Sequence, residues 1–174
     1  MEQKVSVWKS AMTYGLYFAI ASILVSVVFY VTGNPFSKGA QFASYGVMIV
    51  GVVLIQLAYR KALGGSMTYG QGLVIALLSF LFASIIMAIY TILLYEVIDP
   101  GLKEQLRLFT EQKLVEQGKL SQEQIDAALT MTQKFQTPVF MAISSLFTYT
   151  FLGLIIGLIT SIFIQKKPKE DFSA

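Results

Sequence analysis

The sequence predicts an all-α integral membrane protein, a four-helix bundle with an extramembrane helical hairpin between the third and fourth spans. Of its 174 residues, 55% are hydrophobic and 13% are charged, and the mean hydropathy is +0.66. This balance is unusual for a soluble domain. Four long segments contain no charged residue: 10–37, 39–59, 62–95 and 135–165. A bilayer core requires about 20 apolar residues of helix, and a charge at its centre costs about 2.5–3.5 kcal/mol. The four segments therefore predict four spans.

The first two spans are expected to run antiparallel, over about 11–31 and about 42–59. The apolar run of the first span continues too far for a cleaved signal peptide, so we interpret it as a permanent helix. Gly33, Asn34 and Pro35 between the two spans are typical of a tight turn.

The connection to the third span is polar but almost uncharged. Arg60 and Lys61 end the second span, and 66–72 is expected to form an elbow in the membrane interface before a third span of about 73–95. Glycines beside basic residues can bind phosphate through backbone amides. No strand precedes these glycines and no Lys-Ser or Lys-Thr follows them, so a simple turn between helices is the better interpretation.

The segment 96–137 predicts two amphipathic helices before a fourth span of about 139–164. Asp99 and Pro100 are typical of a helix start, which we expect there. Gly118 ends that helix, and Ser121 followed by Gln124 is a capping-box pattern for the next one. Apolar side chains recur at helical spacing, so the two helices should pack as a hairpin. The stripe of the first helix consists of Leu102, Leu106, Phe109 and the stem of Lys113, and that of the second of Ile125, Ala128, Leu129, Thr132 and Phe135.

The placement of Lys and Arg predicts that both termini lie in the cytoplasm. With four spans, one side carries seven basic residues in three short segments beside the membrane, whereas most basic residues of the other side are interspersed with acidic ones in 96–137. The net charge of +3 thus indicates contact with membrane lipids rather than with nucleic acid. The candidate lipid headgroup contacts are Arg60, Lys61, Lys166 and Lys167.

Small residues at four-residue spacing form a ridge on the first span and another on the fourth. Such ridges allow close helix packing in lipid. They could be faces of a homodimer, or internal seams of the bundle, which is the interpretation we favour because a four-span bundle needs such seams. The candidate packing residues are Ala11, Gly15, Ala19, Gly153, Gly157 and Ser161.

The sequence offers few groups for catalysis. It contains no cysteine and no histidine, which excludes thiol chemistry and thiolate metal sites. Glu96 and Asp99 lie three residues apart at the outer end of the third span, a spacing that can place two carboxylates on one helix face. We favour helix capping and interface solvation as their role. We predict a non-enzymatic protein with no metal and no cofactor.

The spans themselves carry no ionisable residue in their cores, which disfavours a carboxylate-coupled transporter. We interpret Gln56 as an amide near a span end that reaches toward water. Hydroxyl groups form the remaining polar candidates for a neutral path in an oligomer: Thr13, Ser22, Ser26, Ser79 and Ser84.

Four sequence segments resemble a family of unknown function. They are KSAMTYGL from Lys9, YRKALGGSMTYGQG from Tyr59, YEVIDP from Tyr95 and LSQEQIDAALTMTQKF from Leu120. With a glycine-containing last span that ends in Lys-Lys, they resemble a domain-of-unknown-function family of small four-span bacterial membrane proteins, mostly of the Bacteroidota. The resemblance implies the same four-span plan and a location in the bacterial inner membrane. No activity is assigned to the family, so no functional residue is carried over.

These observations predict a non-catalytic interaction or accessory protein that uses its hairpin to meet a partner or the membrane surface. Arg107 and Glu111 are the candidate partner-facing residues of the hairpin. The partner is a protein or a second copy of the chain, in addition to membrane lipids. The alternative is a subunit of an oligomeric channel or transporter for a small solute.

Overall fold

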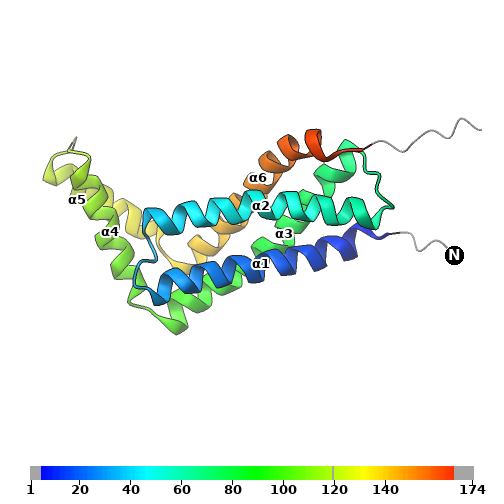
Figure 1. Cartoon of the computed structure of the whole chain (residues 1–174). Helices are drawn as coiled ribbons and strands as arrows, with labels where there is room; N and C mark the ends of the chain where they lie inside the picture. Colours follow the sequence, from blue (N-terminus) through cyan, green and yellow to red (C-terminus); the bar gives the residue numbers. More distant parts are fainter. Residues whose placement is uncertain (1–4, 119, 167–174) are drawn as a thin grey trace, which may run out of the picture. The chain divides into compact units, whose positions relative to one another are not determined.

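The computed structural model describes residues 5–118 and 120–166, and within them the chain is all-α, as predicted. Four of its helices are long and apolar enough to cross a membrane, which makes this a multi-pass membrane protein. They are α1 (Val7–Val31), α2 (Lys38–Ala62), α3 (Tyr69–Leu93) with the short π-helix Leu94–Ile98 that continues it, and α6 (Pro138–Ile164). Two shorter helices, α4 (Leu102–Glu116) and α5 (Gln122–Phe135), lie between α3 and α6 in the chain (Figure 1).

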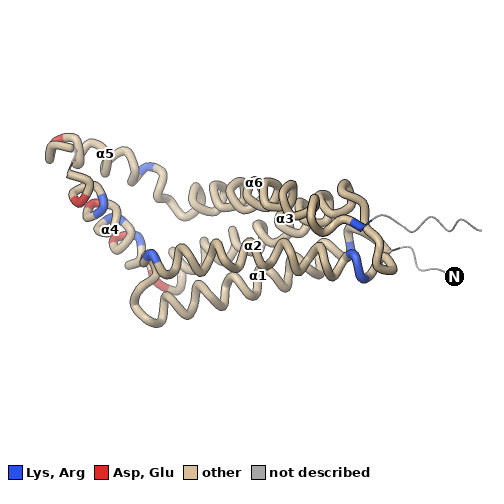
Figure 2. Tube along the Cα trace, turned by 45° about the horizontal axis from the view of Figure 1, so that its top comes forward, with Lys and Arg blue, Asp and Glu red and all other residues tan. Residues whose placement is uncertain are grey.

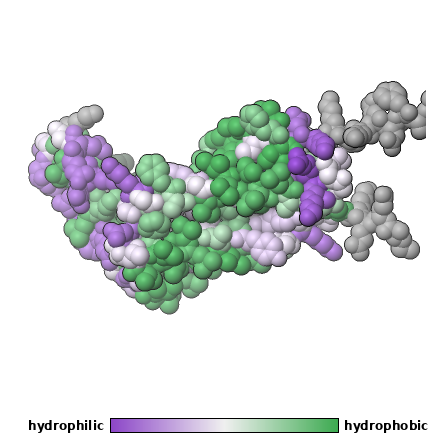
Figure 3. All heavy atoms as spheres, in the orientation of Figure 1, coloured by the Kyte–Doolittle hydropathy of each residue, from purple (hydrophilic) through white to green (hydrophobic). Residues whose placement is uncertain are grey.

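The chain divides into two compact units. Unit 1 consists of Met1–Ile86 and Phe147–Ala174, and unit 2 of Met87–Leu146. Within unit 1, α1 begins where α2 and α6 end (Figure 1). On the face shown in Figure 3 unit 1 is mostly hydrophobic, and hydrophilic residues gather at that end. Figure 2 shows basic residues at this end, where α2 and α6 finish. We call it the basic end of unit 1.

Helix α3 is the centre of unit 1. Phe80 is fully buried, and its ring centroid lies 4.3 Å from that of Phe18 in α1. Ile75, Ala76 and Ala83 of α3 are also fully buried. Helix α3 therefore packs on several sides, whereas α1 exposes many of its apolar side chains, as expected of a surface that faces lipid.

Local capping explains where several helices begin. The Ser6 hydroxyl accepts a bond from the Lys9 amide at the start of α1, and the Ser37 hydroxyl accepts one from the Ala40 amide at the start of α2. Serine satisfies an amide that the first turn leaves without a partner.

The start of α3 differs from the prediction. Thr68 and Gln71 form reciprocal bonds, in which the Gln71 amide donates to the Thr68 hydroxyl and the Thr68 amide donates to Gln71 Oε1. This is a capping box. The expected interfacial elbow over 66–72 is therefore wrong from Tyr69 onward, because these residues already form the first turn of α3. The preceding Gly64 and Gly65 have φ angles of +78° and +92°, which residues other than glycine rarely adopt.

Unit 2 contains the predicted helical hairpin. Gly118, with φ of +61°, ends the turn after α4, and the capping box of Ser121 and Gln124 is present at the start of α5. Ile125 and Leu129 of α5 and Leu102 of α4 are buried. Helix α4 begins at Leu102, slightly later than expected, because Asp99 Oδ1 accepts the Gly101 amide in a turn that precedes it.

One predicted member of the apolar stripes is exposed. Phe135 at the end of α5 is half exposed, and its ring contacts Phe140 at the start of α6, with 5.0 Å between centroids. The stem of Lys113 behaves as expected, because it brings Nζ to 4.4 Å from the centre of the Phe109 ring.

Candidate functional site

Both small-residue ridges lie against α3 of the same chain. Ala11, Gly15 and Ala19 of α1 are buried, and a Cβ built on Gly15 would lie 2.5 Å from Ser79 O and 3.3 Å from Ala83 N. No side chain can occupy that space unless the two helices separate, because the neighbouring atoms belong to the backbone.

The ridge on α6 makes the equivalent contact. A Cβ on Gly153 would lie 2.5 Å from the Phe80 ring, and one on Gly157 would lie 2.9 Å from the Ala76 Cβ. Ser161 completes this ridge and is fully buried. The six predicted packing residues thus serve seams inside one chain in this structure.

A buried amide joins α2, α3 and α6. Gln56 is fully buried, and its Nε2 donates to Ser161 Oγ at 2.9 Å, to Gly72 O at 3.1 Å and, weakly, to Gly157 O at 3.4 Å. The interpretation of Gln56 as an amide that reaches toward water is therefore wrong. Hydropathy along the chain does not show which face of a helix a residue occupies, and Gln56 lies on the inner face of α2.

Two buried polar atoms have no hydrogen-bond partner among the described residues. They are Gln56 Oε1 and Ser79 Oγ. An unpaired buried oxygen costs free energy. The network around Gln56 is therefore only partly satisfied, and its contribution to stability comes from the Nε2 bonds.

The α2–α3 loop is fastened to the last described residues. Met67 N donates to Lys166 O and Lys166 N to Met67 O, both at 2.8 Å, which forms an isolated antiparallel bridge. Arg60 Nη1 donates to Ile164 O at 2.9 Å. Ile164 is the last residue of α6, so no further helical turn follows it. Arg60 thus compensates the free carbonyls at the end of α6.

The predicted lipid-contact residues separate into two groups. Arg60 is partly buried and donates its hydrogen bond to the end of α6, whereas Lys61 and Lys166 are exposed at the basic end of unit 1. Lys167 lies outside the described residues, as does Lys4 in the N-terminal leader.

The carboxylates at the end of the third span do not converge. Glu96 Oε1 pairs with Lys103 Nζ at 3.1 Å, and Asp99 Oδ1 accepts the Gly101 amide. These contacts are structural. In the part of the chain that the structure describes, no cluster of three or more acidic, His or Cys residues is placed to hold a metal ion.

The hydroxyl candidates for a polar path are dispersed. Ser79 and Ser84 are buried inside unit 1, Ser22 and Ser26 are partly exposed, and Thr13 is exposed. Ser84 Oγ donates to Leu81 O in its own helix, a bond that satisfies a hydroxyl without any ligand. These residues do not share one face.

The charged side of α4 forms a compact array around Arg107. Its guanidinium donates to both oxygens of Glu104, at 2.7–3.0 Å, and to Glu111 Oε2 at 3.1 Å. The hydrogen bond from Arg107 lowers the pKa of Glu104, and the bond to Glu104 raises the pKa of Arg107. The predicted pair Arg107 and Glu111 is thus in contact, and sequence reasoning missed Glu104 as the third member, although its (i, i+3) spacing to Arg107 was visible.

Beside this array, α4 exposes apolar side chains. Leu108 and Val115 are 51% and 53% exposed. They alternate along α4 with two carboxylates, in the order Glu104, Leu108, Glu111 and Val115. The intervals of four, three and four residues place all four side chains on one stripe of the helix. We call this stripe the hairpin face.

Comparison with protein families identifies a family whose model matches the chain. The family described as "Protein of unknown function (DUF4199)" matches residues 13–166, which include all four long apolar helices in whole or in large part and both hairpin helices. No curated protein and no solved structure matches the chain.

Proposed function

Because the chain belongs to the DUF4199 family of proteins of unknown function, we propose from its geometry that it is a non-catalytic accessory protein that binds a protein partner through the hairpin face. Its membrane is the bacterial cytoplasmic membrane, with both termini in the cytoplasm and the hairpin outside. The orientation rests on the basic residues at the ends of α1, α2 and α6.

The hairpin face carries this proposal. Exposed large apolar residues on a short helix commonly mark interaction sites, and anchors spaced by about seven residues are typical of a helix that lies in a groove of another protein. Leu108 and Val115 have this spacing. Arg107 forms ion pairs with the Glu104 and Glu111 carboxylates beside them.

The sign of the charge favours a protein over the membrane surface. Helices that lie on anionic membranes are rich in Lys and Arg on their polar face. The hairpin face instead carries Glu104 and Glu111, which a negatively charged leaflet would repel. The complementary partner surface combines an apolar groove with basic groups on its rim.

Site-specific photo-crosslinking in the native membrane tests the proposal. We expect a photoreactive residue at Leu108 or Val115 to yield a defined protein adduct, and the same residue at Thr130, an exposed position on α5, to yield little of it. Adducts with lipid alone, or none at either position, would contradict partner binding by this face.

Charge reversal supplies the second arm. Arg107→Glu removes the bridge between the two carboxylates and should weaken the adduct. Lys134→Glu makes the same change of charge on α5, at an exposed residue away from the array, and should leave it unchanged. Equal effects of the two variants would indicate nonspecific electrostatics.

The channel alternative has no such support, because its hydroxyl residues lie on different faces of unit 1. It would require solute-dependent flux through proteoliposomes that contain the purified protein. We propose that such vesicles conduct no more than protein-free vesicles.

A further inference from the structure

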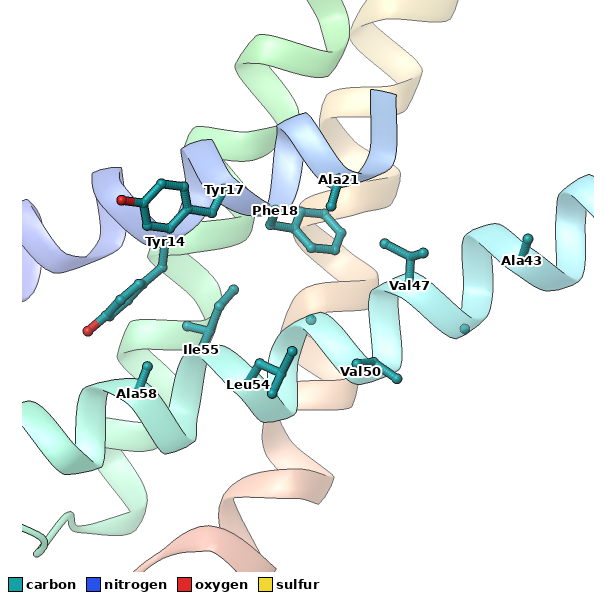
Figure 4. Close-up of a pocket in the computed structure, with 12 residues that line it drawn as sticks. Tyr14, Tyr17, Phe18, Ala21, Ala43, Val47, Val50, Leu54, Ile55 and Ala58 are labelled. Carbon is teal, nitrogen blue, oxygen red and sulfur yellow. The ribbon is translucent and has the colours of Figure 1, made fainter. Parts of the chain in front are cut away.

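An apolar groove lies between α1 and α2 in unit 1. Its volume is about 660 Å³, within the range of ligand-binding pockets. Small residues of α2, among them Ala43, Gly46 and Ala58, line it together with larger aliphatic residues of the same helix. Aromatic residues of α1 line it from the other helix (Figure 4).

The groove has one polar end. Tyr14 and Tyr17 line it, and in Figure 4 both hydroxyls point toward the end where α1 begins and α2 finishes. Neither hydroxyl has a hydrogen-bond partner among the described residues. Along the rest of the groove the lining side chains are apolar, so a polar group of a ligand can be recognised at this end only.

The same end is positively charged. Lys61 follows Ala58 by three residues and Leu54 by seven in α2, so it lies on the helix face that lines the groove. Lys9 lies in the first turn of α1. No acidic residue occurs in the sequence between Glu2 and Glu96, so no described carboxylate of unit 1 competes for these ammonium groups.

From these observations we infer that the groove binds an anionic phospholipid, with one acyl chain between α1 and α2 and the phosphate at Lys61 and the two tyrosine hydroxyls. The site is independent of the hairpin face. The bilayer around the groove is as apolar as the groove itself. The apolar contacts therefore favour a chain that fits the shape of the groove but give little selectivity between lipids. Selectivity for a negative headgroup comes from the basic end.

Native mass spectrometry of the full-length protein provides the test, with phosphatidylglycerol and phosphatidylcholine of identical acyl chains as probes. We expect phosphatidylglycerol to be retained in preference. Lys61→Gln should reduce phosphatidylglycerol binding roughly fivefold, the factor expected when one basic residue is removed from a site that binds an anionic headgroup. Lys38→Gln, at the opposite end of α2, should have little effect.

Filling the groove tests the position of the acyl chain. A Cβ built on Gly46 would meet no atom within 4 Å, so the side chain of Gly46→Leu starts in open space in the groove and should lower retention of both lipids. Gly70→Leu is the matched control, because Gly70 lies in α3, is also unobstructed and does not line the groove.

Three results would overturn the inference. The first is equal retention of the two lipids by the native protein. The second is an equal loss for Lys38→Gln and Lys61→Gln, which would indicate a diffuse charge effect. The third is efficient disulfide formation between two copies of a Val50→Cys variant in the membrane, because Val50 lines the groove and a second copy would then fill it.

Discussion

Replacing Gly15 by alanine adds a single methyl group at a close contact between α1 and α3. That Cβ would lie 2.5 Å from Ser79 O, 3.1 Å from the Phe82 Cβ and 3.3 Å from Ala83 N. The oxygen and the nitrogen belong to the α3 backbone and cannot move aside as a flexible side chain would. The helices must therefore separate, which also loosens the Phe18 and Phe80 contact nearby.

The magnitude follows from two opposing effects. Overpacking a well-packed interface costs about 1–3 kcal/mol, and replacing glycine by alanine within a helix returns about 0.5–1 kcal/mol. At Gly15 we expect a net loss of about 1–2 kcal/mol. At Gly46, where nothing lies within 4 Å of the added Cβ, only the favourable effect of about 0.5–1 kcal/mol remains.

Reversible unfolding in mixed micelles, followed by circular dichroism, measures both variants. The two should change the free energy of unfolding in opposite directions, and the loss for Gly15→Ala should not depend on protein concentration. Equal values for both variants would refute the packing argument. A loss for Gly15→Ala that grows on dilution would instead place Gly15 at an interface between two copies.

Three further predictions concern the polar contacts. Gln56→Leu should cost about 1–2 kcal/mol in the same unfolding assay, because it removes two good interhelical hydrogen bonds and one weak one, whereas Gln41→Leu at an exposed position of α2 should cost much less; similar values would show that the buried network contributes nothing. In a carbon-detected NMR titration the Glu104 carboxyl should titrate below its ordinary pKa of 4.5, and Arg107→Gln should raise it again. Because this pKa is lowered, the contribution of the pair to stability is present above pH 4.5 and is lost as the pH falls through the folded-state pKa; an unchanged titration in the variant would dissociate the shift from Arg107. Ser121→Ala should destabilise α5 by about 1 kcal/mol through loss of its cap, seen as faster hydrogen exchange of the first-turn amides, and Ser66→Ala should leave those amides unchanged.

The sequence was sufficient to predict the fold class because the relevant signals are local. Four uncharged segments specify four long helices, and the Gly118, Ser121 and Gln124 pattern specifies the turn of the hairpin through nearest-neighbour backbone chemistry. The capping box of Thr68 and Gln71 was equally local. The polarity of the same segment, however, is also typical of an elbow in the membrane interface, so the two structures are difficult to distinguish from the sequence.

What the sequence could not predict depends on contacts between distant segments. A ridge such as Ala11, Gly15 and Ala19 looks the same whether it meets another helix of its own chain or a second copy. The position of Gln56 on the inner face of α2 and the bridge between Met67 and Lys166 become visible only when the helices are packed. The groove between α1 and α2 also depends on such contacts, because the residues that line it come from two separate helices.

The side of the membrane on which each polar segment lies distinguishes the proposed orientation from its reverse. The chain contains no cysteine, so single cysteines can be placed at exposed sites, with Gln105→Cys in α4 and Ala62→Cys at the end of α2. A membrane-impermeant maleimide applied to intact spheroplasts should label the Gln105→Cys variant directly and the Ala62→Cys variant only after permeabilisation. Labelling of both variants from the same side, or the reverse order, would contradict the proposed orientation.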